Sequence, residues 1–139
     1  MKKVLILIAL ILTFGVTCSA SMISCALDNQ QYNNLPEPRL KSPIYDTVTL
    51  NVGQPLEFSW WNDCVNTGSF ILKIYKGYNM YADNLILKET LSADLSSYEA
   101  RADLFDDGKV YTWSLVRVSF AGYKSDRSFN SFKVIKRGG

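Results

Sequence analysis

The sequence predicts an all-β fold, a β-sandwich of seven strands that follows a cleaved signal peptide. Three observations support this. From Leu40 onward, short β-favouring runs recur at intervals of about 10 to 14 residues. Gly, Pro, Asn and Asp residues separate the runs, as expected for turns between strands. No segment beyond the signal keeps a helical period of about 3.6 residues for three turns.

Two of the predicted strands alternate clearly with a period of two. In one, the apolar residues Leu56, Phe58 and Trp60 alternate with polar ones, which predicts a half-buried strand. In residues 98–104 the alternation is the cleanest of the chain, and its alanines indicate close approach of the opposite sheet. The seven predicted strands are residues 48–50, 56–61, 70–75, 85–90, 98–104, 111–118 and 132–134.

Three further expectations concern single positions within these strands. Trp60, Tyr111 and Trp113 fall on apolar faces and are predicted to lie in the structural core. Residues 85–90 form a short strand that we expect at a sheet edge. Arg117 falls where an apolar residue is due, which indicates a β-bulge or the end of the covered core.

The first 24 residues have the layout of a bacterial export signal. Lys2 and Lys3 form a short positive region, and residues 4–16 supply an apolar run of 13 residues. A membrane-spanning helix needs about 20 apolar residues. A cleaved signal peptide is therefore the better interpretation of this run.

The segment Met22-Ile23-Ser24-Cys25 resembles the lipobox of bacterial lipoproteins, in which the cysteine is diacylated and becomes the first mature residue. The resemblance implies lipidation at Cys25 and a lipid-anchored location in the cell envelope. The alanine after this cysteine implies the outer membrane if the host is Gram-negative. Two alternatives stay open: lipidation at Cys18, and cleavage after Ala20, which would give a secreted or periplasmic protein in which Cys25 could pair with Cys64.

This layout divides the chain into three parts. Residues 1–24 are the lipoprotein signal peptide, residues 25–37 a lipid-anchored flexible tether, and residues 38–136 the sandwich domain. The tether is rich in Asn and Gln and poor in apolar residues. It therefore cannot bury enough apolar surface to offset the entropy lost on ordering.

Composition argues against catalysis, cofactors and nucleic-acid binding. Without the two signal lysines the chain holds 13 basic and 13 acidic residues, interspersed along it, which leaves no footprint for nucleic acid. It has no histidine, the commonest general base and metal ligand. Asp103, Asp106 and Asp107 lack the spacing of a calcium loop and indicate a solvated turn. We therefore expect no enzyme activity, no metal and no cofactor.

Aromatic residues are the candidate ligand-binding residues. Those predicted to lie outside the core are Trp61, Tyr75, Tyr78 and Tyr81, with Phe120 and Tyr123 in the loop after the sixth strand. Exposed aromatic rings can form a stacking platform for a sugar or a patch for a protein partner. The alternative is that several of them cover loop ends or the second sheet.

Three motifs resemble bacterial fibronectin type III-like modules. A Pro-rich start leads into a strand that ends in Trp60, a turn contains Leu104 and Gly108, and Tyr111 opens the next strand. The resemblance covers nearly the whole domain and implies a sandwich. It also implies that the Tyr111 hydroxyl bonds a backbone group across the corner that precedes its strand.

The sequence thus leads to two hypotheses on function. The first is a non-enzymatic cell-envelope lipoprotein, anchored to a membrane, whose domain acts as a binding or spacer module toward an envelope protein or glycan. The alternative is a secreted carbohydrate-binding or adhesion domain that uses the exposed aromatics.

Overall fold

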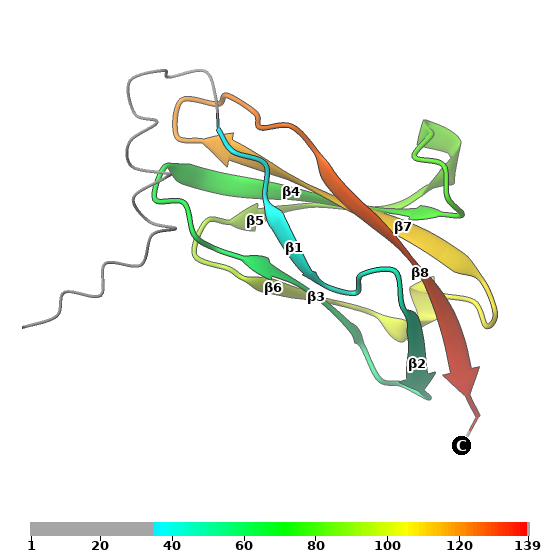
Figure 1. Cartoon of the computed structure of the whole chain (residues 1–139). Coiled ribbons are helices and arrows are strands. Elements are labelled where there is room, and N and C mark those ends of the chain that lie inside the picture. The colour runs from blue at the N-terminus through cyan, green and yellow to red at the C-terminus, as the bar shows by residue number, and fades with distance from the viewer. Residues whose placement is uncertain (1–34, 139) are drawn as a thin grey trace, which may run out of the picture.

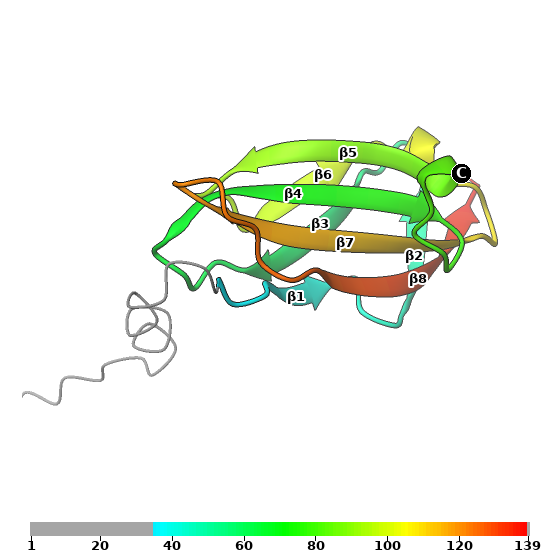
Figure 2. The same cartoon turned by 90° about the horizontal axis from the view of Figure 1, so that it is seen from above.

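The computed structural model describes residues 35–138, which form a two-layer β-sandwich (Figure 1). A three-stranded sheet of order β1-β3-β6 packs on a five-stranded sheet of order β2-β8-β7-β4-β5, and Figure 2 shows the larger sheet from its outer side. The all-β prediction is confirmed. The elements are β1 (Arg39–Ser42), β2 (Thr47–Asn51), β3 (Leu56–Trp61), β4 (Thr67–Lys76), η2 (Ala82–Asn84), β5 (Leu85–Ser92), β6 (Ser97–Ala100), η3 (Ala102–Leu104), β7 (Val110–Ser119) and β8 (Ser128–Arg137).

The described residues contain eight strands where the sequence predicts seven, because β1 was missed. β1 pairs antiparallel with β3, whereas β2 pairs parallel with β8, so the chain passes from one sheet to the other between them. Pro43 lies at this passage and has no N–H to continue a ladder. Its carbonyl oxygen accepts a hydrogen bond from Trp113 Nε1 at 2.8 Å. The strand predicted at the edge, now β5, does lie at an edge of the larger sheet.

The prediction of one strand over residues 98–104 is wrong in its second half. β6 ends at Ala100, and η3 follows at once. Arg101 and Asp103 are exposed while Ala102 and Leu104 are partly buried, so alternating exposure continues through the helical turn. The period of two in this segment therefore records burial rather than strand pairing.

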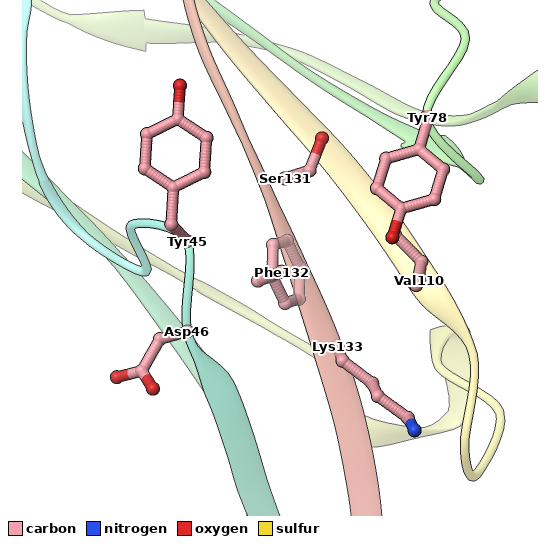
Figure 3. A pocket seen from close by; sticks show the side chains of 7 residues that line it. All are labelled: Tyr45, Asp46, Tyr78, Val110, Ser131, Phe132 and Lys133. Carbon is pink, nitrogen blue, oxygen red and sulfur yellow. The ribbon is translucent and has the colours of Figure 1, made fainter.

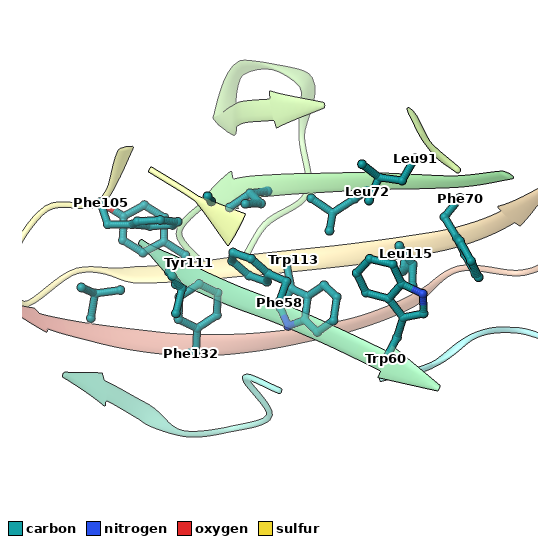
Figure 4. Packing of buried hydrophobic residues seen from close by; sticks show 14 of the residues in the cluster. Phe58, Trp60, Phe70, Leu72, Leu91, Phe105, Tyr111, Trp113, Leu115 and Phe132 are labelled. Atoms are coloured by element: carbon teal, nitrogen blue, oxygen red, sulfur yellow. The ribbon is translucent and has the colours of Figure 1, made fainter. Parts of the chain in front are cut away.

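The core between the sheets is rich in aromatic side chains (Figure 4). Trp60, Tyr111 and Trp113, which the sequence places in the core, are fully buried. Phe58 of β3 lies edge-on to Trp113 and to Phe132, at centroid distances of 5.1 and 5.6 Å. Such edge-to-face pairs add about 0.5–1.5 kcal/mol beyond the area they bury.

The corner before β7 has the hydrogen bond that the resemblance implies. The backbone N–H of Asp106 donates to the Tyr111 hydroxyl at 2.6 Å. Gly108 turns the chain with φ of 70°, and its N–H donates to the Val134 carbonyl at 2.8 Å. The buried phenol oxygen is thus satisfied and the corner is tied to both β7 and β8.

Arg117 is the only charged side chain buried within residues 35–138. It keeps its register in β7, and the nearby irregularity lies between Thr67 and Ser69 on the paired strand β4, so Arg117 itself is not at a bulge. The Arg117 guanidinium is 1 % exposed, lies 5.9 Å from the Phe70 ring centroid and donates to Asp63 Oδ1 at 3.0 Å. An ion pair, rather than an apolar residue, closes the core here.

Asp63 links this buried cation to the surface. Burial of the Asp63 carboxyl opposes its ionisation, but hydrogen bonds and charge from Arg117 and Arg39 outweigh that effect and hold its pKa below the usual 3.8. Arg39 reaches the other carboxylate oxygen with Nη2 at 2.6 Å.

Several predictions fall outside the described residues. These are the signal peptide, the tether up to residue 34 and lipidation at Cys25. Within residues 35–138, no helix is both long enough and apolar enough to cross a membrane. Cys64 is buried and disulfide-bonded, and the other two cysteines of the chain are Cys18 and Cys25.

Candidate functional site

Tyr75 is not available to a ligand, contrary to the sequence-based expectation. It is only 4 % exposed. A register shift between Ile74 and Tyr75 in the pairing with β5 leaves both residues buried in succession. On its other side Tyr75 pairs with Thr112, which is fully buried and donates to the Gly77 carbonyl. The outer face of the five-stranded sheet is therefore shielded from solvent where Tyr75 and Thr112 lie side by side.

The other three candidate aromatics do not form one platform. Trp61 ends β3, near the start of β4, whereas Tyr78 and Tyr81 lie in the connection after β4. β4 has ten residues, which corresponds to about 30 Å at about 3.3 Å per residue. All three rings are exposed, but Trp61 lies at one end of the sandwich and Tyr78 and Tyr81 lie at the other.

Tyr78 instead belongs to a groove of about 310 Å³ that crosses β8 (Figure 3). Tyr45, from the β1–β2 connection, stands on one side of β8, and Tyr78, from the β4–β5 connection, stands on the other. We call this site the tyrosine groove. Its lining residues are Tyr45, Asp46, Tyr78, Val110, Ser131, Phe132 and Lys133.

Tyr45 is held in place by its backbone rather than by packing of its ring. Its φ is 45°, a left-handed conformation that costs a residue with a side chain about 1–2 kcal/mol. Its N–H donates to Asn130 Oδ1 at 2.6 Å, and the next carbonyl, of Asp46, accepts from the Lys133 N–H at 2.9 Å. The ring is 82 % exposed, so its packing does not offset the strain.

Tyr78 is fixed through the residue before it. Gly77 has φ of 86° and donates its N–H to the Val110 carbonyl at 2.8 Å. Its carbonyl accepts from Thr112 Oγ1 at 2.8 Å, and that hydroxyl also bonds the Ser131 hydroxyl at 2.7 Å. Both walls of the groove are therefore tied to the strands that form its floor.

The groove combines apolar faces with polar groups of both charges. Two tyrosine rings stand at its sides, and Ser131, Lys133 and Asp46 are among its lining residues. Such an arrangement can stack on the apolar face of a ring-shaped ligand and hydrogen-bond the hydroxyl groups at its edge. Within residues 35–138 no group of three or more His, Cys, Asp or Glu side chains could hold a metal.

The outer face of the five-stranded sheet carries clustered positive charge. Lys73 and Lys88 lie opposite each other on β4 and β5. Partial burial lowers the pKa of Lys73, and the charges of Lys88, Arg127 and Lys124 lower it further. The four ion pairs found in residues 35–138 involve other cations. The charges are therefore less evenly mixed in space than along the sequence.

Sequence reasoning found Tyr78 but missed the rest of the groove. Tyr45 lies in a Pro-rich segment with no periodic pattern, and its strained φ arises from tertiary hydrogen bonds. Ser131 and Lys133 have the solvent-facing parity of β8, which is ordinary for a sandwich. The one available signal was an aromatic residue two positions after Pro43, in a segment otherwise expected to be only a connection.

Comparisons with known proteins support the fold and no more. No protein family model and no curated protein sequence matches the chain. A computationally redesigned β-sandwich protein superposes with a TM-score of 0.54 at 12% identity, over 73% of this chain and 97% of that one. The spore cortex lytic enzyme SleM of Clostridium perfringens gives 0.50 at 14%, over 70% of this chain and 28% of the enzyme. The fibronectin(III)-like modules of Clostridium thermocellum CbhA give 0.46 at 13%, over 73% and 98%.

Proposed function

We propose that this chain is a non-enzymatic cell-envelope protein whose sandwich domain acts as a binding module, with the tyrosine groove as its binding site. One observation carries the proposal. Tyr45 is kept in a strained backbone conformation while its ring lies in solvent, so the ring contributes to the groove and little to the core. Strain of this kind concentrates at functional sites. If the domain acted only as a spacer, the strained Tyr45 and the groove would have no function.

Photo-crosslinking tests the binding module. The full chain is expressed in an exporting bacterium with a photo-crosslinking phenylalanine derivative at Tyr78, and separately at Tyr81. Both tyrosines are exposed and lie in the same connection, but only Tyr78 lines the groove. We expect envelope products from position 78 that Tyr45→Ala abolishes. Equal products from both positions, or none from either, would contradict the groove and favour a spacer.

A second candidate is the secreted carbohydrate-binding domain. The observation that favours it is that two tyrosines line one groove together with Ser131, Lys133 and Asp46. A glycan array with the mature protein tests it. Sugar binding lost in Tyr45→Ala and Tyr78→Ala but kept in Tyr81→Ala supports a glycan ligand, and loss in all three contradicts a site in the groove.

Anchoring through Cys25 is a separate part of the proposal. The N-terminal signal and the lipobox-like segment support diacylation of Cys25, which would hold the protein on a membrane through two acyl chains. The disulfide of Cys64 bears on this choice, because a Cys25 sulfur bonded to Cys64 cannot carry lipid. Mass spectrometry of the mature N-terminus decides between them. An N-terminal Ser21 with a Cys25–Cys64 disulfide would refute lipidation.

A further inference from the structure

Exposed apolar side chains gather at the end of the sandwich where the described chain begins. In Figure 1 the first described residues and the β7–β8 loop lie at the same end, opposite the C-terminus. Trp61 ends β3, Val65 lies in the β3–β4 loop, and Phe120 and Tyr123 lie in the β7–β8 loop. All four are exposed. We call them the tip surface.

Backbone contacts place these loops side by side. Thr67 at the start of β4 pairs with Ser119 at the end of β7. A Cβ added to Gly68 would lie 3.0 Å from the backbone nitrogen of Phe120. The β3–β4 loop with Val65 is therefore directly beside the turn that carries Phe120.

Phe120 is presented to solvent by a well-formed turn. The Gly122 N–H donates to the Ser119 carbonyl at 3.0 Å, and the Ser119 N–H donates to the Tyr123 carbonyl at 2.8 Å. Phe120 is 79 % exposed at the crown of this turn. Polar residues and glycine fit such positions at least as well, so the fold gives no reason for a phenylalanine here.

Two lysines lie next to residues of the tip surface. Lys41 Nζ lies 4.1 Å from the Trp61 ring centroid, and Lys124 directly follows Tyr123 in the chain. The carboxylate of Asp63, at the same end, is already paired with Arg39 and Arg117. Apolar and aromatic side chains with lysines at their margin are typical of surfaces that bind the interface of an anionic membrane.

The path of the chain brings this end toward the proposed anchor. Ser128 Oγ donates to the Pro38 carbonyl, so the domain begins beside the β7–β8 loop. The ten residue-to-residue steps from Cys25 to Leu35 can span at most about 33–36 Å. A chain attached at Cys25 would therefore hold the first residues of the domain, at the tip end, within that distance of the membrane.

We propose that the tip surface docks on the surface of a phospholipid membrane that contains anionic lipids. Phe120 and Val65 enter the interfacial layer, Trp61 and Tyr123 lie at headgroup level, and Lys41 and Lys124 contact the phosphates. Basic side chains near the surface and buried apolar area both contribute to such binding. The inference rests on the envelope location proposed above and does not require lipidation.

Tryptophan fluorescence gives a direct test, because Trp61 is exposed while Trp60 and Trp113 are fully buried. The mature protein from an exporting host is mixed with phosphatidylcholine vesicles, with or without phosphatidylglycerol, that carry brominated acyl chains. We expect quenching of Trp61 that is stronger with phosphatidylglycerol and decreases with salt. Trp61→Phe identifies the signal. Quenching reports docking whether or not Cys25 carries lipid, so its failure is distinct from failure of the anchor, which flotation and mass spectrometry report.

Three variants decide the outcome. Phe120→Ser should weaken the apparent vesicle affinity, or the quenching of an anchored protein, about tenfold. Lys124→Glu should remove most of the preference for phosphatidylglycerol. Phe129→Ser, which changes an exposed ring on β8 outside the tip surface, should leave both unchanged. Absence of Trp61 quenching, equal effects of Phe120→Ser and Phe129→Ser, or a dimer in sedimentation that Phe120→Ser dissociates would overturn membrane docking.

Discussion

The tyrosine groove and the tip surface both expose aromatic rings, but their surroundings differ. In the groove, hydrogen bonds to the Asn130 side chain and from the Thr112 hydroxyl fix the two walls, and polar residues line the floor. At the tip, a turn presents Phe120 without a polar floor, and lysines lie at the margin. The groove suits a ligand that needs directed hydrogen bonds, and the tip suits an interface that needs only apolar contact and charge. The groups beside an exposed ring decide what it can bind.

The largest expected effect on the free energy of unfolding concerns the Asp63–Arg117 ion pair, at the same end of the domain as the tip surface. Asp63→Asn should destabilise the protein by about 3–5 kcal/mol, because Arg117 stays buried and loses its only carboxylate. Arg39→Gln, which removes the exposed partner of the same carboxylate, should cost less than about 1 kcal/mol. Urea unfolding measures both. Similar costs for the two variants would show that the buried pair is no stronger than a surface pair.

The same carboxylate predicts that the stability of the protein depends on pH. The folded pKa of Asp63 lies below 3.8, so its contribution is complete above that value and is lost as the pH falls through the lower folded pKa. Unfolding free energies from about pH 5 to about pH 2 should therefore decrease more steeply in the wild type than in Asp63→Asn. Parallel curves would contradict this assignment.

An intermediate effect is expected at the groove wall. Asn130→Ala removes the acceptor of the Tyr45 N–H and should cost about 1–3 kcal/mol, because a backbone donor is left without its partner. The variant should also weaken binding in the groove and leave Trp61 quenching by vesicles unchanged. Calorimetric unfolding and the two binding assays measure these effects. Loss of vesicle docking in Asn130→Ala would mean that the two surfaces are not independent.

The smallest expected effect separates stability from binding. Tyr45→Gly relieves a positive φ and should raise the free energy of unfolding by about 0.5–1 kcal/mol while it abolishes binding in the groove. Phe120→Ser at the tip should change stability by less than about 0.5 kcal/mol. Chemical denaturation distinguishes the two. A destabilised Tyr45→Gly would show that the tyrosine ring supports the fold.

Much of the fold was readable from the sequence because burial on one face of a strand imposes a period of two. This period located most of the strands and the buried Trp60, Tyr111 and Trp113. The period of two did not locate strands correctly where the alternation of exposed and buried residues does not coincide with strand pairing. Residues 102–104 keep the alternation in a helical turn, and the four-residue β1 is too short and too close to proline to show one.

The candidate site was less predictable, because it depends on contacts between distant segments. Tyr75 was misassigned since a register shift, invisible in the sequence, buries two neighbours in succession. Tyr45 acquires its position from Asn130, which lies 85 residues later. Arg117 was noticed as an exception to the apolar pattern, but its partner Asp63 is 54 residues away. Local sequence patterns identify which face of a strand is buried, but they do not identify the distant residues that it contacts.

The parallel pairing of β2 with β8 has a mechanical consequence. Five consecutive residue pairs, from Thr47↔Lys133 to Asn51↔Arg137, connect the first strand of the larger sheet to the last strand of the domain. Because the two strands run the same way, tension applied to the chain before β2 and after β8 pulls them in opposite directions along their length. The hydrogen bonds then bear the load together in shear instead of opening one by one. A domain pulled through the chain at both of these points would resist such tension until this pair slides apart as a unit.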